Sequence, residues 1–495
     1  MRLTILGGGG FRVPLVYGAL LRDRAEGRVT HLTLYDLDPA RLAAIARVLG
    51  DQAARAAAEG VPDAPEVSVT TDLDEALRGA DFVFSAIRVG GLEGRAADER
   101  IALAEGVLGQ ETVGAGGIAY GLRTVPVAVD IARRVARLAP EAWVINFTNP
   151  AGLVTEAMSR HLGERVIGIC DSPVGLARRV ARTLGVADPA SARVDYVGLN
   201  HLGWLRGLYV AGRDVLPQLF ADDARLTSFE EGRLFGADWL RSLGSVPNEY
   251  LHYYYFNREA VAAYQQARQT RGAFLRDQQA RFYDALRTGP ASRAATGPQG
   301  AAWEAWDRTR AEREATYMAE NREAAGAGER AADDLESGGY EYVALALMRA
   351  VARDERTTLI LNVRNGRSTT PAVDRPVADR PDVGLSDGSR EGGGLHGGRV
   401  LDVLDEAAVV EAPCLVDATG AHPLAVSQLT GHEAGLVAAV KAVERCALAA
   451  GESGSRREAV KAFALHPLVD SVQVAHRLLE GYRGAHPGLD YLRKD

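Results

Sequence analysis

The stretch "RLTILGGGGFRVP", residues 2–14, decides the fold because a short apolar run passes directly into four glycines. A run of this length that ends at glycine is typical of a buried strand followed by a tight turn. Glycines at such a turn let the backbone approach a pyrophosphate at the start of a helix. The next apolar run ends at Asp36, whose carboxylate can bind ribose hydroxyls. The pattern therefore predicts a dinucleotide-binding unit.

The expected dinucleotide is NAD. Asp36 favours NAD over NADP because a 2′-phosphate would meet a carboxylate. We expect the cofactor to be bound by the glycine turn and by the acid after the second strand, namely by Gly7, Gly9, Gly10, Phe11, Arg12 and Asp36. The turn lacks the third glycine of the GxGxxG motif, since residue 12 is arginine, so an ordinary strand-to-helix turn remains a second interpretation.

Further apolar runs continue this pattern through the first third of the chain. Four of them, at 31–36, 81–87, 142–147 and 165–170, alternate with amphipathic helical stretches. Such alternation predicts an α/β fold with a parallel sheet, here an N-terminal Rossmann domain over residues 1–195.

The rest of the chain, residues 196–495, predicts a mixed α/β domain. Helical patterns dominate from about 214 to 350, and the Ala-, Arg- and Glu-rich segment 300–335 has the pattern of solvated helix. Residues 367–399 are rich in Pro, Gly, Asp, Ser and Arg and lack aromatic residues, which predicts a mobile loop.

The bulk composition favours an enzyme for small molecules in a reducing compartment. The 495 residues include 57 Lys and Arg against 65 Asp and Glu, a net charge of −8, and the basic residues are dispersed. We therefore expect no nucleic-acid and no membrane partner. The first apolar run is too short for a signal peptide, and no apolar segment reaches the ~20 residues of a membrane span. Three distant cysteines, Cys170, Cys414 and Cys446, predict reduced thiols and a cytoplasmic location.

Two metal-ligating residue types follow predicted strands. Cys170 ends the apolar run of "VIGICDSPVG", residues 166–175, and Asn200 and His201 end the run of "VDYVGLNHLGW", residues 194–204. The carboxyl ends of strands in an open α/β sheet are where ligands bind. A thiolate and an imidazole form a plausible partial site for a divalent metal. The other interpretation, a small buried cysteine and a hydrogen-bonded core histidine, stays open on these two residues alone.

Two further groups of residues are candidates for binding or catalysis. The segment "VPNEYLHYYYF", residues 246–256, holds Tyr250 in an aromatic cluster that is either a packed face or the source of a base near a metal. Asparagine before proline, as at Asn149 in "NFTNPAG", suits a loop that presents an amide to a ligand, although such a residue is often only a turn former.

Taken together, these motifs resemble one family. The segments "GQET", "GLRTVPV", "INFTNPAGLVTEA", "GICDSPVG", "GLNHLGW" and "PNEYLHYYY" occur in this order. They are similar to the NAD- and divalent-metal-dependent glycosidases of glycoside hydrolase family 4, an exception to two-carboxylate glycoside hydrolysis. The resemblance implies a Rossmann domain followed by a mixed α/β domain, similar to the lactate and malate dehydrogenases.

The resemblance also implies roles for the metal and for a base. Cys170 and His201 match the family's metal ligands, usually for Mn²⁺, and Tyr250 matches the tyrosine that removes the C2 proton of the sugar. The implied reaction oxidises C3 with NAD⁺, eliminates the C1 leaving group from an enediolate, adds water and returns the hydride. No net redox change results.

Substrate contacts are implied in the same way. Arg95 and Arg271 match contacts to a substrate phosphate, Asn149 matches a sugar-binding asparagine, and we also expect Asn200 to bind substrate. The segment "RVGGLEGRAADERI" is similar to the 6-phospho-β-glucosidases, whereas Asp171 resembles the leaving-group acid of the 6-phospho-α-glucosidases. Asp171 could instead orient a metal ligand.

The expected function is hydrolysis of 6-phospho-β-glucosides, such as a phosphorylated disaccharide, by a homodimer or homotetramer. The alternatives are a 6-phospho-α-glucosidase, a sugar or hydroxy-acid dehydrogenase on the same scaffold, and a non-catalytic sensor of sugar phosphate or NAD. A dehydrogenase would accumulate NADH, and a sensor would show no turnover.

Overall fold

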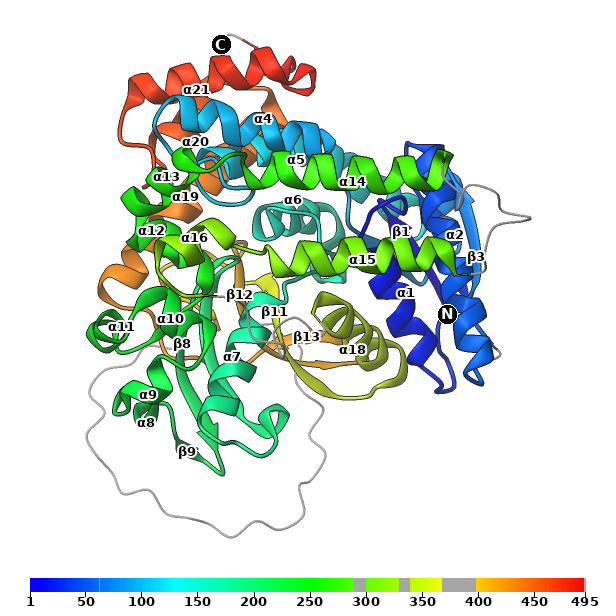
Figure 1. Cartoon of the computed structure of the whole chain (residues 1–495), viewed down its shortest axis with the longest axis horizontal. Coiled ribbons are helices and arrows are strands. Elements are labelled where there is room, and N and C mark those ends of the chain that lie inside the picture. The colour runs from blue at the N-terminus through cyan, green and yellow to red at the C-terminus, as the bar shows by residue number, and fades with distance from the viewer. Residues whose placement is uncertain (62, 289–299, 329–338, 367–397, 494–495) are drawn as a thin grey trace.

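The structure is a computed structural model that describes residues 1–61, 63–288, 300–328, 339–366 and 398–493. One continuous mixed sheet runs through the molecule in the order β10-β8-β7-β12-β11-β6-β5-β4-β1-β2-β3, with β13 beside β12 and β9 beside β8. Figure 1 shows the N-terminal end of the sheet on the right, the second half on the left and the C-terminal helices above. Among the described helices, none is both long and apolar enough to cross a membrane.

The first half is a parallel sheet in the Rossmann order β3-β2-β1-β4-β5-β6. Its strands are β1 (Arg2–Leu6), β2 (His31–Tyr35), β3 (Glu66–Thr70), β4 (Phe82–Ser85), β5 (Trp143–Asn146) and β6 (Val166–Ile169). Its helices are α1 (Val13–Arg22), α2 (Pro39–Ala58), α3 (Leu73–Leu77), α4 (Gly91–Ala104), α5 (Gly114–Leu138), α6 (Ala151–Leu162) and α7 (Ser172–Thr183). The predicted α/β fold with a Rossmann-type sheet is therefore confirmed.

Local sequence explains how these elements begin. Helix α2 starts where Asp38 accepts hydrogen bonds from the backbone N–H groups of Ala40 and Arg41, with Pro39 in the first turn. Strands β1 and β4 are apolar on both faces because helices cover each side of the sheet. One face packs on α1, α2 and α18, and the other packs on α3, α5 and α6.

The second half extends the sheet with antiparallel strands. They are β7 (Arg193–Leu199), β8 (Leu202–Val210), β9 (Arg213–Asp214), β10 (Val246–Pro247), β11 (Thr357–Arg364), β12 (Val409–Asp417) and β13 (Gly420–Pro423). Strand β11 pairs antiparallel with β6, so the sheet continues from the Rossmann half without a break. The division of the chain at residue 195 stays a prediction.

Helices of the second half surround these strands. The shorter ones are α8 (Pro217–Phe220), α9 (Asp223–Leu226), α10 (Glu230–Phe235), α11 (Ala237–Leu243), α12 (His252–Tyr255), α13 (Asn257–Gln266), α16 (Ala319–Ala324) and α20 (Arg456–Ala464). The longer ones are α14 (Arg271–Thr288), α15 (Ala301–Ala315), α18 (Tyr340–Arg353), α19 (Gly431–Ser453) and α21 (Val472–Ala485). Short 3₁₀ turns are η1 (Gly163–Arg165), η2 (Pro189–Ser191), η3 (Glu249–Leu251) and η5 (Pro487–Leu489). Helices α14 and α15 lie side by side and reach α2 of the first half.

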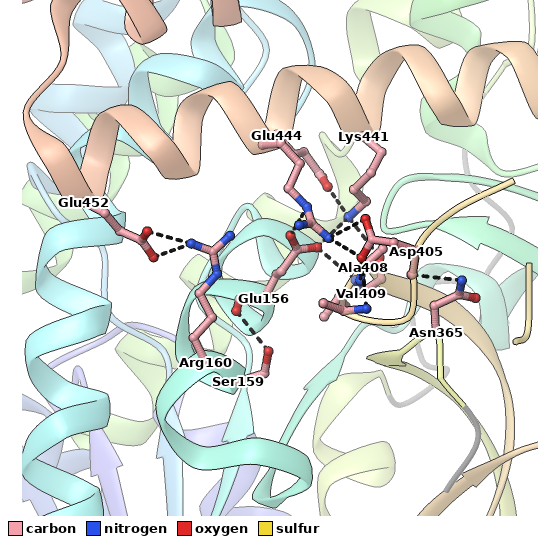
Figure 2. A network of polar contacts seen from close by, with 12 residues as sticks. Glu156, Ser159, Arg160, Asn365, Asp405, Ala408, Val409, Lys441, Glu444 and Glu452 are labelled. Atoms are coloured by element: carbon pink, nitrogen blue, oxygen red, sulfur yellow. Dashed lines mark hydrogen bonds and ion pairs between the residues drawn. The ribbon is translucent and has the colours of Figure 1, made fainter.

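A buried ionic network joins the two halves (Figure 2). Lys441 of α19 donates to Glu156 of α6 at 3.0 Å and to the Val409 carbonyl at 2.9 Å, and it also pairs with Glu444. Arg445 pairs with Glu156 and with Asp405. Although burial favours the neutral amine, Glu444 and Glu156 raise the pKa of Lys441 above its ordinary value. The positive charge of Lys441 is therefore balanced by carboxylates of the protein itself.

Three segments differ from the sequence predictions or are only partly described. Strand β3 was not predicted; it lies at the edge of the sheet, and none of its residues is fully buried. Segment 300–335 was expected to be solvated, and most of its described residues are at least partly exposed, but Trp306 is buried, and Arg313 and Tyr317 line a cleft. Of the expected mobile loop 367–399, residues 367–397 lie outside the described residues, and Arg399 forms an antiparallel bridge with Gly366.

Candidate active site

A single cleft of about 1350 Å³ opens at the carboxyl ends of the parallel strands. This volume exceeds the roughly 300–1,000 Å³ of a typical small-molecule site and leaves room for a dinucleotide and a second ligand. The predicted site residues that line it are Gly7, Gly10, Phe11, Arg12, Asp36, Arg95, Asn149, Cys170, Asp171, His201, Tyr250 and Arg271. Gly9 and Asn200 do not line it.

The glycine turn brings β1 close to its neighbours. Gly7 has a φ of +83°, and a Cβ at this position would lie 2.6 Å from the Ala86 carbonyl oxygen. The N–H groups of Gly7 and Gly8 donate to the Tyr35 carbonyl at 2.9 and 2.7 Å. The N–H of Gly9 donates to Asp36 Oδ2 at 3.0 Å, which orients the carboxylate at the end of β2. Only glycine fits such a conformation and such close approaches.

Three aromatic side chains from the second half hold the carbonyl groups of this turn. The Tyr283 hydroxyl of α14 donates to the Gly9 carbonyl at 2.7 Å. The Trp306 indole of α15 donates to the Phe11 carbonyl at 2.8 Å. The Tyr340 hydroxyl of α18 donates to the Arg12 carbonyl, also at 2.8 Å. The turn is thus built by both halves of the chain.

Cys170 and His201 meet at the other end of the cleft. Cys170 follows β6 and His201 follows β7, and Cys170 Sγ lies 3.5 Å from His201 Nε2. Burial lowers the pKa of His201 to about 3, so the imidazole is neutral. Burial and then Glu411 raise the pKa of the Cys170 thiol well above its ordinary value. A neutral imidazole next to a thiol is a suitable ligand pair for a divalent metal.

The geometry of the pair fits a metal. Protein ligands lie about 2.3 Å from a zinc-type ion through sulfur and about 2.1 Å through nitrogen, so one ion can bind both atoms across 3.5 Å. No cluster of three or more His, Cys, Asp or Glu side chains that could hold a metal occurs in the part of the chain that the structure describes.

Tyr250 lies against the imidazole. The rings of Tyr250 and His201 stack with centroids 3.6 Å apart and planes 5° apart, and His201 has a φ of 63°. The Tyr317 hydroxyl donates to the Tyr250 hydroxyl at 3.0 Å. Burial and then Glu249 raise the pKa of Tyr250 well above its ordinary value, so the phenol stays protonated unless positive charge is brought near.

Glu249, next to Tyr250, was not predicted and is an unusual carboxyl group. Its Oε1 accepts a hydrogen bond from Ser172 at 2.7 Å, and its buried Oε2 has no hydrogen-bond partner among the described residues. Burial and then the neighbouring Glu231 raise the pKa of Glu249 to about 7. Direct adjacency to Tyr250 in the sequence was the one signal that could have identified it.

The other predicted polar residues have different surroundings. Asp171 and the partly exposed Asn149 both line the cleft. Asn200, which does not line it, donates from Nδ2 to Glu411 Oε1 at 3.1 Å. Glu411 also accepts from Tyr196 and Asn362, and burial raises its pKa to about 7. A substrate role for Asn200 stays a prediction.

Arg95 is already held by carboxylates. Its Nε donates to Glu99 at 2.9 Å and its Nη1 donates to Glu111 at 2.6 Å, and Glu111 also pairs with Arg88. Although burial opposes ionisation, Arg88 and Arg95 hold the pKa of Glu111 well below its ordinary value. The predicted contact of Arg95 with a phosphate is not tested by these contacts and stays a prediction.

Arg271 and Arg313 carry less compensated charge. Arg271 donates only to neutral oxygens, Thr316 Oγ1 at 2.7 Å and the Arg313 carbonyl at 2.9 Å, and no ion pair of Arg271 occurs among the described residues. Burial and then Arg95 lower its pKa. Arg313 of α15 has Glu314 at 3.8 Å, and burial followed by Arg12 lowers its pKa to about 9. Both line the cleft, which therefore offers an anion site.

Sequence comparisons extend over nearly the whole chain. The sequence model of "Family 4 glycosyl hydrolase" matches residues 2–186, and that of "Family 4 glycosyl hydrolase C-terminal domain" matches residues 196–374 and 395–469. The chain is 30% identical to "Probable 6-phospho-beta-glucosidase" of Bacillus subtilis (strain 168), over 98% of this chain and 96% of that protein. It is 28% identical to "6-phospho-alpha-glucosidase 1" of Lacticaseibacillus paracasei, over 97% and 95%.

The fold has close counterparts among solved structures. The structure of the 6-phospho-beta glucosidase from Thermotoga maritima with NAD and glucose-6-phosphate superposes with a TM-score of 0.74 at 25% identity, over 98% of each chain. A second structure of that protein, with manganese, NAD⁺ and glucose-6-phosphate, gives a TM-score of 0.75 at 24% identity over 100% of each chain. Both halves of the sequence match, and the protein therefore belongs to glycosyl hydrolase family 4.

Proposed function

We propose that the protein is an NAD- and Mn²⁺-dependent 6-phospho-β-glucosidase. The observation that carries this proposal is the Cys170–His201 pair, stacked on Tyr250, in the same cleft as the glycine turn. A nucleotide turn alone would suit many reactions. A neutral imidazole, a thiol and a phenol beside it form a site for a metal and a base.

Each cofactor has a fitting set of residues. NAD binds along the glycine turn, with Asp36 at the ribose, since its carboxylate is held by Gly9 at the end of β2. Cys170 Sγ and His201 Nε2 would hold Mn²⁺. When bound, NAD would supply reversible hydride transfer with the sugar, and the metal would supply positive charge beside the reacting hydroxyl groups.

The chain itself supplies proton transfer and orientation. Tyr250 removes the C2 proton, and positive charge at the adjacent metal site favours its ionised form. Its hydroxyl is oriented by Tyr317 at 3.0 Å. Asp171, at the start of α7 and lining the cleft, protonates the leaving group. Asn149, which lines the cleft, binds the sugar.

The substrate carries a phosphate. Support comes from the positive charge of Arg271 and Arg313, which no carboxylate offsets at hydrogen-bond distance among the described residues. A phosphate dianion would accept charge-assisted hydrogen bonds from both groups. Arg95, which Glu99 and Glu111 hold in place, is the third arginine of this phosphate site.

The β-anomer is the preferred substrate. The segment "RVGGLEGRAADERI", which forms most of α4, supports it, and the 30% identity to the Bacillus protein agrees. The 6-phospho-α-glucosidase of L. paracasei is nearly as similar at 28% identity, so the anomer is the part of the proposal that most needs measurement. Function in the reducing cytoplasm suits a site that depends on a free thiol, and the three cysteines are unpaired. A homodimer or homotetramer stays a prediction.

The test is release of p-nitrophenol from the α- and β-glucoside 6-phosphates and from the unphosphorylated α- and β-glucosides. NAD⁺, Mn²⁺ and a thiol reductant are each omitted in turn. Release from the β-phosphate only with all additions supports the proposal. Release from the α-phosphate alone would transfer the assignment to the α class, and steady accumulation of NADH would instead indicate a dehydrogenase.

The cysteine assignment has its own control. Cys170→Ser should abolish metal-dependent activity while NAD⁺ binding is retained, because Cys170 lies away from the glycine turn. Cys446→Ser is the matched change, since Cys446 lies on α19 and does not line the cleft. Equal activity of both variants would contradict Cys170 as a metal ligand.

A further inference from the structure

The imidazole of His201 has a second polar partner that the reaction scheme does not use. Its Nδ1 lies 2.7 Å from Thr112 Oγ1, on the side of the ring away from Cys170. Thr112 belongs to the "GQET" segment immediately before α5, and it is remote in sequence from both expected metal ligands. The hydroxyl of Thr112 has one proton to donate, so its direction of donation decides which nitrogen of His201 carries hydrogen.

The direction is set by Gln110. Gln110 Oε1 accepts the backbone N–H groups of Thr112 at 2.7 Å and of Val113 at 2.9 Å, which identifies this atom as the oxygen of the amide. The same oxygen lies 3.1 Å from Thr112 Oγ1, and Gln110 is buried. Because an amide oxygen can only accept, the Thr112 hydroxyl must donate to Gln110.

The opposite arrangement is unfavourable. If Thr112 donated to His201 Nδ1, two acceptor oxygens would face each other at 3.1 Å with no proton between them. With Thr112 donating to Gln110, its oxygen accepts the Nδ1–H of His201. The neutral ring then has its lone pair on Nε2, the nitrogen that faces Cys170 Sγ.

We propose that Gln110 and Thr112 are positioning residues that hold His201 in the Nδ1–H tautomer, with Nε2 open to the metal. The ring plane is fixed independently by the stack on Tyr250 at 3.6 Å. Side chains that hydrogen-bond the second nitrogen of a metal-binding histidine typically affect metal affinity by about 10–100-fold. This inference rests on the proposed function, which makes Cys170 and His201 the metal ligands.

The test uses Mn²⁺ titration of the NAD-saturated full-length protein, followed by electron paramagnetic resonance of free Mn²⁺. Thr112→Val removes the hydroxyl and should weaken Mn²⁺ binding by about 10–100-fold. Thr112→Ser keeps the hydroxyl and should restore affinity close to the wild-type value. Thr124→Val is the matched control, because the buried Thr124 hydroxyl has no hydrogen-bond partner among the described residues. Thermal unfolding of each variant excludes a general loss of fold.

A second readout measures the tautomer in the wild-type protein itself. In wild-type protein labelled with ¹⁵N-histidine and free of metal, the nitrogen shifts should identify His201 as the Nδ1–H tautomer, with assignment by His201→Ala. An Nε2–H tautomer would overturn the proposal, as would wild-type Mn²⁺ affinity in Thr112→Val. Failure of the underlying metal site looks different, because Cys170→Ser would then bind Mn²⁺ as tightly as the wild type.

Discussion

Two buried ionic clusters in this protein treat positive charge in opposite ways. Around Lys441, at the junction of α6 and α19, carboxylates raise the pKa of the buried amine (Figure 2). Around Arg313, in the cleft, burial and neighbouring cations lower the pKa of the guanidinium to about 9. The Lys441 side chain is 4% exposed and the Arg313 side chain is 14% exposed. Only the first has anions of the protein within ion-pair distances of 3.0 Å or less.

The contrast separates a structural role from a binding role. A buried ion pair costs desolvation energy, which its own attraction must offset. The Lys441 cluster meets this cost internally and fastens the two halves together. Arg271 has no ion pair among the described residues and Arg313 has only Glu314 at 3.8 Å, so we expect this part of the cleft to attract an anion. Unmatched buried charge is a better indicator of a ligand than the mere presence of arginine.

The largest expected effect is loss of stability when the matched cluster is broken. Lys441→Met leaves Glu156 and Glu444 without the ammonium group they share and should lower the free energy of unfolding by about 3–5 kcal/mol. Urea unfolding measures this change. Additional Glu156→Gln and Glu444→Gln substitutions should recover part of the loss. A decrease below about 1 kcal/mol would mean that the cluster is not a structural fastening.

A carboxyl group of the cleft should make stability depend on pH. The pKa of Glu249 is raised from 4.5 to about 7, so the folded state favours the protonated form. This stabilisation is fully present below the unfolded pKa and is lost as the pH rises through about 7. Glu249→Gln removes it and keeps an oxygen that can accept from Ser172. Between about pH 5 and pH 8, the wild type should lose up to about 3 kcal/mol relative to the variant. If the difference in unfolding free energy between the wild type and Glu249→Gln did not change with pH, the raised pKa of Glu249 would be contradicted.

Removing unmatched charge should change substrate use rather than stability. Arg313→Met should lower kcat/KM for the phosphorylated glucoside by the equivalent of about 1.5–3 kcal/mol, the value of hydrogen bonds to charged groups. Its free energy of unfolding should stay the same or rise. Arg308→Met, on the same helix but outside the lining of the cleft, is the matched control. Equal effects of the two variants would remove Arg313 from the phosphate site.

The smallest expected loss of stability concerns the Arg160–Glu452 ion pair beside the Lys441 cluster. Arg160 pairs with Glu452 at 2.6 Å, but both side chains are about one-third exposed. Arg160→Met should therefore cost under about 1 kcal/mol in urea unfolding, because solvent screens such pairs. A loss as large as that of Lys441→Met would show that exposure does not distinguish these pairs.

The sequence predicts those parts of the site that follow directly from strands. Cys170 comes directly after the apolar run that forms β6, and His201 comes two residues after the end of β7, so the strand pattern could mark both as candidate ligands. Gly7 and Asp36 were predictable for the same reason. At each of these positions, the local strand pattern agrees with where the residue lies in the fold, so the pattern alone was enough to identify it.

Residues brought in by docked helices were not predictable in this way. The Ala-, Arg- and Glu-rich pattern of α15 indicates a solvated helix, yet its packing on α14 and α2 buries Trp306 and places Arg313 in the cleft. Asn200 adjoins His201 in sequence, yet its side chain hydrogen-bonds to Glu411 and does not line the cleft, which the sequence pattern did not indicate. Such outcomes depend on long-range packing, which periodicity does not encode.

The three aromatic donors on the glycine turn have a consequence for the modularity of the protein. Tyr283, Trp306 and Tyr340 come from helices far along the chain, and each satisfies a carbonyl of the turn that would otherwise face the cleft. The nucleotide-binding turn therefore depends on the second half of the chain. In the isolated Rossmann half, these three hydrogen bonds to the turn would be missing. Because a ligand that binds only the folded state stabilises it, we expect a bound dinucleotide to stabilise the docking of these helices together with the turn.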